Sequence, residues 1–184
     1  MRTRLAVPKP CRVGLVLAAG ADMNVERIMC SDAKTCRADG SLNDAARIMW
    51  EHDCGFVPVV DDIGRVVSVI TDRDICMAAY TQGARLEEIP VSRAASHGAI
   101  TVLPGESIER AEALMRRHRV RRLPVVNEAG GCVGVLSMND LARNLHLARA
   151  HSGALRPESV AQTLAAISTP RGEETPAISS REPL

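Results

Sequence analysis

The sequence predicts a mixed α/β protein (α+β) built from a duplicated β-α-β-β-α unit, and three observations support this prediction. Displacing the 184-residue chain by 66 positions aligns it with itself without a gap, and residues 48–75 and 114–141 are then identical at nine of 28 positions. Both copies place a helical pattern before two short β-rich runs. A unit of roughly 55 residues buries little surface alone, so two copies packing together about a pseudo-twofold axis give the expected core.

Each unit is expected to open with an extended segment and a helix. Thr35 and Thr101 lie in the extended segments, and Ser41 and Ser107 have the character of N-caps. In the first unit apolar residues follow at i, i+3, i+4 and i+7, which is helical spacing: Leu42, Ala45, Ala46 and Met49. Residues 25–30 and 91–96 are predicted to form short helical turns that lead into the two units.

Two strands and a second helix complete each unit. The runs FVPVV and RVVSVI in the first unit, and LPVV and CVGVLS in the second, are rich in β-branched residues and are separated by the turns DDIG and NEAGG. We expect the Pro-Val-Val segments to be buried strands. The second helix should begin after Thr71 in one unit and after Ser137 in the other, where it is expected to continue through residues 143–150.

The repeat divides the chain into four parts. Residues 23–84 and 85–150 are the two repeats, residues 1–22 are predicted to be a disordered leader, and residues 151–184 are a tail. The tail has an amphipathic stretch at 158–167 and a Pro, Ser, Glu and Thr composition from residue 168 that indicates disorder. The apolar run near residues 13–21 is far shorter than the ~20 residues that cross a bilayer. No membrane span is therefore expected, and the protein is predicted to be cytoplasmic.

Composition argues against several classes of function. The 23 basic and 22 acidic residues give a formal net charge of +1, so no overall field favours a polyanionic partner. Aromatic residues make up only 2% of the chain, too few for base-stacking platforms. The six cysteines lack zinc-finger spacing and are predicted to be mainly small buried thiols, although a disulfide involving Cys36 or Cys11 stays open.

The strand-to-helix junction carries one pattern in both units. Residues 67–75 read VSVITDRDI and residues 133–141 read VGVLSMNDL. A hydroxyl residue is followed three positions later by an aspartate, which is typical of a capping box and needs no ligand. The same junction exposes backbone N–H groups suited to phosphate and a carboxylate that can accept hydrogen bonds from ribose hydroxyls. The two interpretations are compatible, and the residues concerned are Thr71, Asp74, Ser137 and Asp140.

This duplicated pattern resembles a tandem CBS-domain pair, or Bateman module, over about residues 25–145. The organisation is similar to that of small stand-alone bacterial CBS-pair proteins. The resemblance implies a regulatory or signalling module that binds AMP, ADP, ATP or S-adenosylmethionine between the repeats, without chemistry on the ligand. It also implies a homodimer, often a disc-like one, with an unknown protein partner. No catalytic residue, metal site or required cofactor is expected.

The resemblance implies two clefts, of which the one at the second repeat, the second-repeat cleft, is suited to phosphate. It would combine Arg122, Ser137 and Asp140 with the backbone around Thr35 of the other repeat. Arg122 closes the basic run RRHRVRR at residues 116–122, whose counterpart WEHDCGF ends on Phe56. A guanidinium at this position offers bidentate geometry to a phosphate.

The other cleft, at the first repeat and called the first-repeat cleft, is expected to be less favourable for phosphate. It would use Thr71 and Asp74 with the segment from residue 97 to Thr101. Ser68 stands where the second repeat has Gly134, which is expected to narrow this cleft. In both clefts adenine would lie against backbone groups near two apolar residues, Val57 and Leu123.

Three alternatives remain. The main one is a ligand-free dimeric interaction or scaffold protein whose repeats supply only a stable surface. A nucleic-acid adaptor is suggested only by the arginine run. An enzyme is the least favoured, because the only carboxylate–hydroxyl sets are helix starts and no nucleophile–base constellation can be identified.

Overall fold

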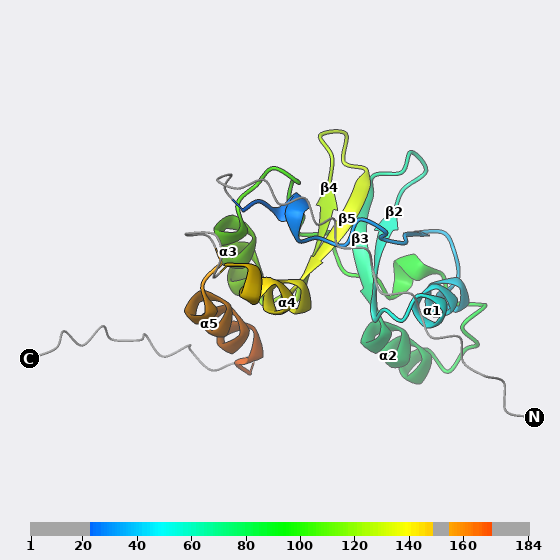
Figure 1. Ribbon diagram of the computed structural model, residues 1–184. Helices are drawn as coiled ribbons and strands as arrows, with labels where there is room; N and C mark the ends of the chain where they lie inside the picture. The colour runs from blue at the N-terminus through cyan, green and yellow to red at the C-terminus, as the bar shows by residue number, and fades with distance from the viewer. Residues whose placement is uncertain (1–22, 149–154, 171–184) are drawn as a thin grey trace, which may run out of the picture.

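The computed structural model describes residues 23–148 and 155–170. The predicted leader at 1–22 lies outside the described residues, and so does the disorder predicted from residue 168 except at residues 168–170, where Ser168 is instead the last residue of a helix. Within the described part, two sheets stand side by side at the centre of the molecule and the helices lie outside them (Figure 1). The mixed α+β architecture predicted from the duplication is confirmed.

The first repeat has the predicted β-α-β-β-α order, and the second has the same order with a single bridge at Val102 in place of its first strand. The first repeat contains β1 (Cys36–Arg37), α1 (Leu42–Glu51), β2 (Phe56–Val60), β3 (Val66–Thr71) and α2 (Asp72–Gln82). The second contains α3 (Ile108–His118), β4 (Arg122–Val126), β5 (Cys132–Ser137) and α4 (Met138–Ala148). The single-turn helices η1 (Val25–Arg27) and η2 (Val91–Arg93) precede the repeats, and α5 (Pro157–Ser168) follows them.

The sheets share one topology. β1 runs parallel to β2, and β2 pairs antiparallel with β3. In the second repeat β4 pairs antiparallel with β5, and a parallel bridge between Val102 and Val125 takes the place of the β1–β2 pairing. The register shifts at Val59/Val60 and at Val125/Val126, which are equivalent positions 66 residues apart. The buried Pro-Val-Val strands are therefore confirmed in both repeats, down to a shared irregularity.

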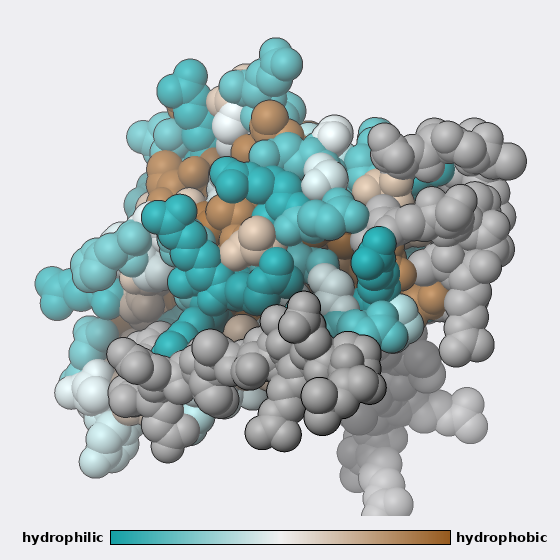
Figure 2. All heavy atoms as spheres, turned by 90° about the vertical axis from the view of Figure 1, so that its left-hand side faces the viewer, coloured by the Kyte–Doolittle hydropathy of each residue, from teal (hydrophilic) through white to brown (hydrophobic). Residues whose placement is uncertain are grey.

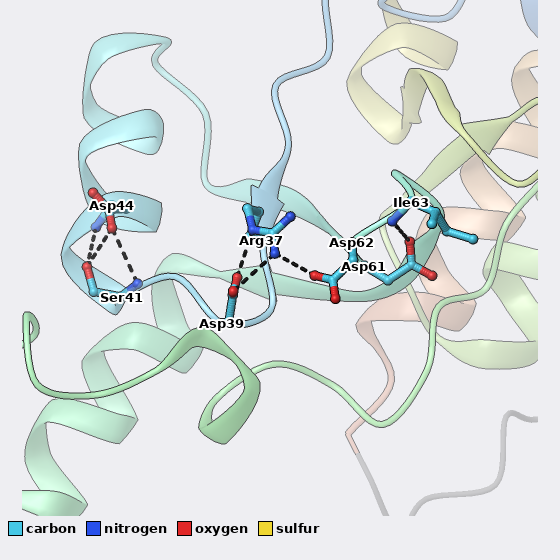
Figure 3. Close-up of polar contacts among 7 residues, drawn as sticks. All are labelled: Arg37, Asp39, Ser41, Asp44, Asp61, Asp62 and Ile63. Carbon is cyan, nitrogen blue, oxygen red and sulfur yellow. Dashed lines mark hydrogen bonds and ion pairs between the residues drawn. The ribbon is translucent and has the colours of Figure 1, made fainter.

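Helix α1 begins at a capping box that needs no ligand. The Ser41 side chain accepts a hydrogen bond from the Asp44 backbone N–H at 3.2 Å, and the Ser41 N–H donates to Asp44 Oδ2 at 3.3 Å (Figure 3). Hydrogen bonds from Ser41 hold the pKa of Asp44 below its usual value, because they favour the charged carboxylate. Ser41 is thus the N-cap predicted from the sequence.

An exposed ion pair ties β1 to the β2–β3 turn. The Arg37 guanidinium donates to Asp39 at 2.9 Å and to Asp62 at 2.5 Å, so one cation joins two loops (Figure 3). Asp61, next in the same turn, accepts hydrogen bonds from the Ile63 and Arg65 backbone N–H groups. These bonds fix the tip of the hairpin, although pairs this exposed contribute little to stability.

The repeats exchange the segments that lead into them. Val25 and Ile28, which precede the first repeat, are fully or almost fully buried in the core of the second. Val91, which precedes the second repeat, is fully buried in the core of the first. Cys30 forms an antiparallel bridge with Val135 of β5. Each core therefore draws on both repeats, which couples their folding.

The pseudo-twofold axis runs between equivalent backbone positions. Arg65 and Gly131, which are 66 residues apart, form an antiparallel bridge to each other. The Val66 N–H also donates to the Gly130 carbonyl at 3.0 Å. Figure 1 shows β3 and β5 adjacent at the centre, with α1 and α2 at one end and α3, α4 and α5 at the other. The predicted packing of two repeats about such an axis is confirmed.

Helix α5 covers the helices of the second repeat. The amphipathic pattern at 158–167, which puts Val160, Leu164 and Ile167 on one face, correctly predicted a helix, and Val160 and Ile167 are buried. The third buried residue is Thr163, however, and Leu164 is 49% exposed. Thr163 is buried because its hydroxyl accepts a hydrogen bond from the Arg116 guanidinium of α3 at 2.6 Å.

The cysteines are less buried than predicted. Cys36 is a buried free thiol, and burial raises its pKa to about 11. Cys54 and Cys132 are half-buried, Cys76 is exposed, and all three are free thiols. Cys30 is disulfide-bonded. The prediction of mainly buried thiols is thus wrong for the described cysteines, because Cys54 only borders the first core and Cys76 lies on an exposed position of α2.

Candidate functional site

The junction of β3 and α2 forms a capping box around Asp74. The Thr71 backbone N–H and hydroxyl both donate to Asp74 Oδ2, at 2.9 and 2.7 Å. The Asp74 N–H donates to the Thr71 hydroxyl oxygen at 3.2 Å. Both side chains are half-buried. The capping interpretation is therefore confirmed here, and the second carboxylate oxygen, Oδ1, takes no part in the cap.

The junction of β5 and α4 repeats this arrangement in a more enclosed setting. The Ser137 N–H donates to Asp140 Oδ2 at 2.8 Å, and the Asp140 N–H donates to the Ser137 hydroxyl at 3.3 Å. Asp140 is only 3% exposed. Its Oδ1 accepts a hydrogen bond from the Arg143 guanidinium at 2.6 Å. A carboxylate buried this deeply needs such a cation, since desolvation otherwise disfavours its charge.

Arg143 was missed by the sequence analysis. It lies one turn beyond Asp140 on the same helix face, and its side chain is 61% exposed while that of Asp140 is 4% exposed. The i, i+3 spacing of an acid and a base on a predicted helix was the signal that could have found it. The pair keeps the charge of Asp140 balanced, and it places a largely exposed cation at the edge of the junction.

The strand register brings Arg122 to this junction. Arg122 is the first residue of β4 and the register partner of Ser137 on β5. In the first repeat the same register pairs Phe56 with Thr71. The structure therefore places Arg122 at the same end of the second hairpin as Ser137 and Asp140, and Phe56 at the corresponding point of the first.

Arg122 and Phe56 also meet each other across the pseudo-twofold axis. The Arg122 guanidinium carbon lies 6.0 Å from the centroid of the Phe56 ring, within the range of a cation–π contact. Phe56 is 9% exposed, whereas Arg122 is half-buried. The ring lies beside the guanidinium and uses none of its hydrogen-bond donors, which leaves the guanidinium able to bind an anion.

The two threonines lie on the crossing segments between the repeats. Thr35 is half-buried and stands between Cys30, which bridges to β5, and Cys36, which pairs with β2. Thr101 is half-buried and directly precedes Val102, which bridges to β4. Each threonine therefore lies on backbone that leaves one repeat and enters the other. No hydrogen bond within the described residues joins either threonine to the hydroxyl–aspartate pairs.

Val57 and Leu123 have only backbone to offer a ligand. Both side chains are 0% exposed, and they face Ile70 and Leu136 in the register of their hairpins. Their role as lining for adenine was predicted through backbone groups, and the burial is consistent with that. The prediction itself is not tested by the geometry.

Gly134 provides room for the crossing segment. A Cβ atom at this position would lie 2.8 Å from the Cys30 carbonyl oxygen and 2.8 Å from Met29 Sδ. The space that a side chain would occupy at residue 134 is therefore filled by Met29 and Cys30, which lead into the first repeat. Ser68, its counterpart, is buried at 9% exposure. The proposed narrowing of the first-repeat cleft by Ser68 stays a prediction.

Metal binding and membrane insertion receive no support from the described residues. In the described part of the chain, no three His, Cys, Asp or Glu side chains gather as metal ligands would. Within residues 23–148 and 155–170, each helix is too short or too polar to cross a bilayer.

Two exchanged β-α-β-β-α repeats with matched hydroxyl–aspartate junctions define a tandem-repeat α+β module. Residues 25–80 and 88–147 both match the CBS domain family. These two matches span more than half of the chain, and the chain therefore belongs to the CBS domain family. The identification of a tandem pair from the repeated junction is confirmed.

Relatives of known sequence fall into two groups by length. The CBS domain-containing protein YhcV of Bacillus subtilis is 35% identical over 121 residues, which cover 66% of this chain and 84% of YhcV. The homoserine O-acetyltransferase of Methanococcoides burtonii is 31% identical over 120 residues, and the match covers only 24% of that enzyme. The chain is thus similar to a small CBS protein over most of its length and to a minor part of the enzyme.

Related solved structures contain adenosyl ligands. The CBS domain protein PAE2072 from Pyrobaculum aerophilum, complexed with AMP, is 28% identical with a TM-score of 0.59, and the match covers 69% of this chain and 99% of that one. The CBS domain pair of protein MJ0100, in complex with 5′-methylthioadenosine and S-adenosyl-L-methionine, is 25% identical with a TM-score of 0.59, covering 66% of this chain and 98% of that one. Similar CBS pairs therefore bind adenosyl small molecules.

Proposed function

We propose that this protein is a cytoplasmic regulatory module that binds an adenosyl ligand, with AMP, ADP, ATP or S-adenosylmethionine as the candidates, and that it signals as a homodimer. The observation that carries the proposal is the second-repeat junction, where Arg122 and Ser137 are register partners and Asp140 is 3% exposed. A cation, a hydroxyl and a carboxylate at one helix start match the phosphate and ribose of a nucleotide.

The ribose would bind where the capping box stands. Asp140 Oδ2 already accepts from the Ser137 hydroxyl, and Oδ1 accepts from Arg143. A ribose diol is a donor that can replace Arg143 at Oδ1, because the arginine is largely exposed and free to swing toward solvent. Ligand binding and helix capping then use different oxygens of one carboxylate and do not compete.

The phosphate would bind beside Arg122. The Arg122 guanidinium lies over Phe56, so the side chain has already lost part of its conformational freedom before an anion binds. Preorganisation of this kind lowers the entropic cost of binding. The N-terminus of α4 adds the positive end of the helix dipole, although the Met138 N–H already donates to the Arg121 carbonyl and the Asp140 N–H to the Ser137 hydroxyl.

The two clefts differ in charge because only the second-repeat cleft has an arginine at the start of its hairpin. The first-repeat junction has Thr71 and Asp74 in the same capping geometry, but Phe56 stands where the second has Arg122. We infer that a phosphate-bearing ligand binds in the second-repeat cleft, and that the first-repeat cleft takes a less charged adenosyl compound or stays empty. Thr35 would border the former cleft and Thr101 the latter.

Catalysis is not part of the proposal. The polar residues at both junctions cap helices and hold no nucleophile beside a base. The homoserine O-acetyltransferase relative matches over only 24% of its length. The shared portion is the CBS pair, which supports a regulatory role for that portion. No cofactor would be required, since the adenosyl compound acts as a signal.

A ligand-free dimeric scaffold is the competing function, and one observation favours it. The Ser137 hydroxyl and both carboxylate oxygens of Asp140 already have hydrogen-bond partners within the protein. If capping accounts for the whole pattern, the repeats supply only a stable surface for an unknown protein partner.

Titration calorimetry with AMP, ATP and S-adenosylmethionine distinguishes these functions. The regulatory module predicts measurable heat with at least one of these ligands, and loss of that heat in Asp140→Ala. Asp44→Ala is the matched control, because Asp44 caps α1 with the same Ser-x-x-Asp spacing far from the clefts. Absence of heat with every adenosyl ligand would leave the scaffold as the better account.

A further inference from the structure

The turn between α3 and β4 carries a cluster of arginines. Residues 117–122 read RHRVRR, and we call this segment the basic turn. Three of its arginines, Arg117, Arg119 and Arg121, are exposed, and Arg122 is half-buried. Figure 2 faces the α3 and α5 end of the molecule, and the described surface there is mainly hydrophilic, with apolar residues in small groups.

The arginines of the basic turn have no acidic partner within residues 23–148 and 155–170. Their one described side-chain hydrogen bond runs from the Arg119 guanidinium to the Pro170 carbonyl at 3.5 Å. Five other arginines in the described residues each pair with a carboxylate: Arg37, Arg47, Arg85, Arg110 and Arg143. The basic turn is therefore a patch of positive charge whose donors are largely unused.

The fold does not require basic residues at this turn. A shift of 66 residues carries Arg117 to Glu51 and Arg119 to Asp53, so the equivalent turn of the first repeat is acidic. The backbone is nevertheless the same, because φ is 51° at Arg119 and 49° at Asp53. A cation near the end of a helix offsets the dipole, which accounts for Arg117. The remaining arginines lie beyond the end of α3, where like charges repel one another unless an anion binds them.

The basic turn borders the second-repeat cleft. The Arg121 carbonyl accepts a hydrogen bond at 3.0 Å from the N–H of Met138, the first residue of α4. Arg122, the next residue, is the register partner of Ser137. One end of the basic turn is therefore part of the candidate phosphate site, and the other end lies on the last turn of α3.

A short acidic protein segment suits this surface better than a nucleic acid does. Guanidinium groups bind carboxylates in bidentate geometry, and clusters of arginines commonly recognise acidic motifs. A single strand of nucleic acid would need aromatic side chains for base stacking. Residues 113–127 contain none, and the Phe56 ring beside Arg122 is only 9% exposed. A duplex would need cations along a longer track, whereas the net charge of the chain is only +1.

We propose that the basic turn binds an acidic segment of a partner protein, and that a nucleotide phosphate on Arg122 weakens this contact. The second part rests on the nucleotide site proposed above, whereas the first does not. A bound phosphate neutralises Arg122 and lowers the positive potential at Arg121, because charges within a Debye length of about 8 Å act on each other. Coupling between two sites is reciprocal, so the acidic segment weakens nucleotide binding by the same factor.

Fluorescence anisotropy of a labelled octaglutamate peptide, titrated with the full chain, tests the surface. We expect saturable binding at about 0.15 M salt that weakens as the salt concentration rises. The test variant combines Arg117→Glu with Arg119→Asp, which introduces the residues that the first repeat carries in the same backbone conformation. It should lower the affinity for the peptide by about tenfold or more, since two attractive charges become repulsive.

The control variant combines Arg65→Glu with Arg93→Glu. Both residues are exposed and lie outside the basic turn, and the net charge changes by the same amount as in the test variant. The affinity for the peptide should be almost unchanged. An equal loss in the two variants would show that the peptide responds only to net charge, and would overturn the proposal. Absence of peptide binding to the wild type would overturn it too, as would tighter binding of a short DNA duplex than of the peptide.

AMP tests the coupling between the basic turn and the cleft. Calorimetry first measures AMP binding, and the peptide titration is then repeated at saturating AMP. We expect the affinity for the peptide to fall by about fivefold or more, a typical size for coupling between sites. AMP that binds without changing this affinity would overturn the coupling. If AMP gives no heat while the peptide still binds through the basic turn, the nucleotide site and the coupling are both rejected and the partner surface stands.

Discussion

The Arg122 guanidinium carbon lies 6.0 Å from the centroid of the Phe56 ring, and the two residues occupy equivalent positions of the two repeats. The pseudo-twofold axis therefore brings the largest chemical difference between the repeats to one point. Each residue begins a strand and faces the hydroxyl residue of its own junction in the strand register. The cation therefore lies at the second-repeat junction, and the ring of the first repeat lies beside it.

Replacing Arg122 should weaken phosphate-bearing ligands selectively. Arg122→Gln is expected to reduce AMP affinity by about ten- to a hundredfold, since hydrogen bonds to charged groups are typically worth about 1.5–3 kcal/mol. The affinity for 5′-methylthioadenosine, which lacks phosphate, should change by less than about threefold, as expected where no charged contact is lost. Titration calorimetry measures both. Arg117→Gln, on the exposed end of α3, is the control. Equal losses for the two ligands would mean that Arg122 does not contact phosphate.

The capping and binding roles of the junction can be separated with a pair of serines. Ser41→Ala and Ser137→Ala each remove a side chain that accepts a backbone N–H at a helix start. Each should lower the free energy of unfolding by about 1 kcal/mol. Only Ser137→Ala should also lower AMP affinity. Urea unfolding and calorimetry on both variants give the comparison, and a loss of affinity in Ser41→Ala would show that binding merely follows stability.

A methyl group at residue 134 should disturb the exchange of segments between the repeats. The Cβ of Gly134→Ala would lie 2.8 Å from the Cys30 carbonyl oxygen, which belongs to the backbone and cannot rotate away. We expect a loss of about 1–3 kcal/mol in the free energy of unfolding, the usual cost of overpacking. Gly105→Ala is the control, because nothing lies within 4 Å of its added Cβ. An unchanged stability of Gly134→Ala would show that the crossing segment is loosely held.

The docking of α5 should make stability depend on pH through Glu112. Burial raises the pKa of Glu112 above its usual value, with Glu109 adding to the effect, while hydrogen bonds from Ser159 and Thr163 and the charge of Arg116 oppose it. The unfolded chain therefore loses this proton at lower pH than the folded chain does. The free energy of unfolding must fall as pH rises from the unfolded-state value through the folded-state one.

Glu112→Gln should remove that fall. Urea unfolding at several pH values from 4 to 8 is expected to show a flatter profile for the variant, with its greatest relative gain at the highest pH. Glu109→Gln, which is exposed on the same helix, serves as the control. A profile for Glu112→Gln that runs parallel to the wild type would show that burial of this carboxyl has no thermodynamic consequence.

The element order could be predicted because the duplication repeats it twice. Helical spacing from Leu42 to Met49 and the Pro-Val-Val runs are local signals, and local signals report helix and strand well. The exchange of Val25 and Val91 between the cores could not be predicted. Both residues lie in similar short turns, and the local sequence does not indicate into which of the two related cores each turn will pack.

The helix caps at the two junctions were predicted from the sequence, whereas the contacts around them were predicted less well. The spacing of Ser137 and Asp140 indicated a capping box, and the structure has one. The contact of Arg122 with Phe56 could not be read from the sequence, because it depends on how closely the repeats approach at their axis. Thr163 was missed on α5 for a similar reason, since its burial is decided by the facing Arg116 and not by its own hydropathy.

The central claim is that a nucleotide binds at the Arg122, Ser137 and Asp140 junction. A crystal structure of the full chain grown with AMP tests it most directly. We predict one AMP per chain, with its phosphate on the Arg122 guanidinium and its ribose hydroxyls on Asp140, and with Arg143 displaced from Asp140 Oδ1. A structure with AMP at saturating concentration and no density at this junction, or with AMP bound only at Thr71 and Asp74, would contradict the account.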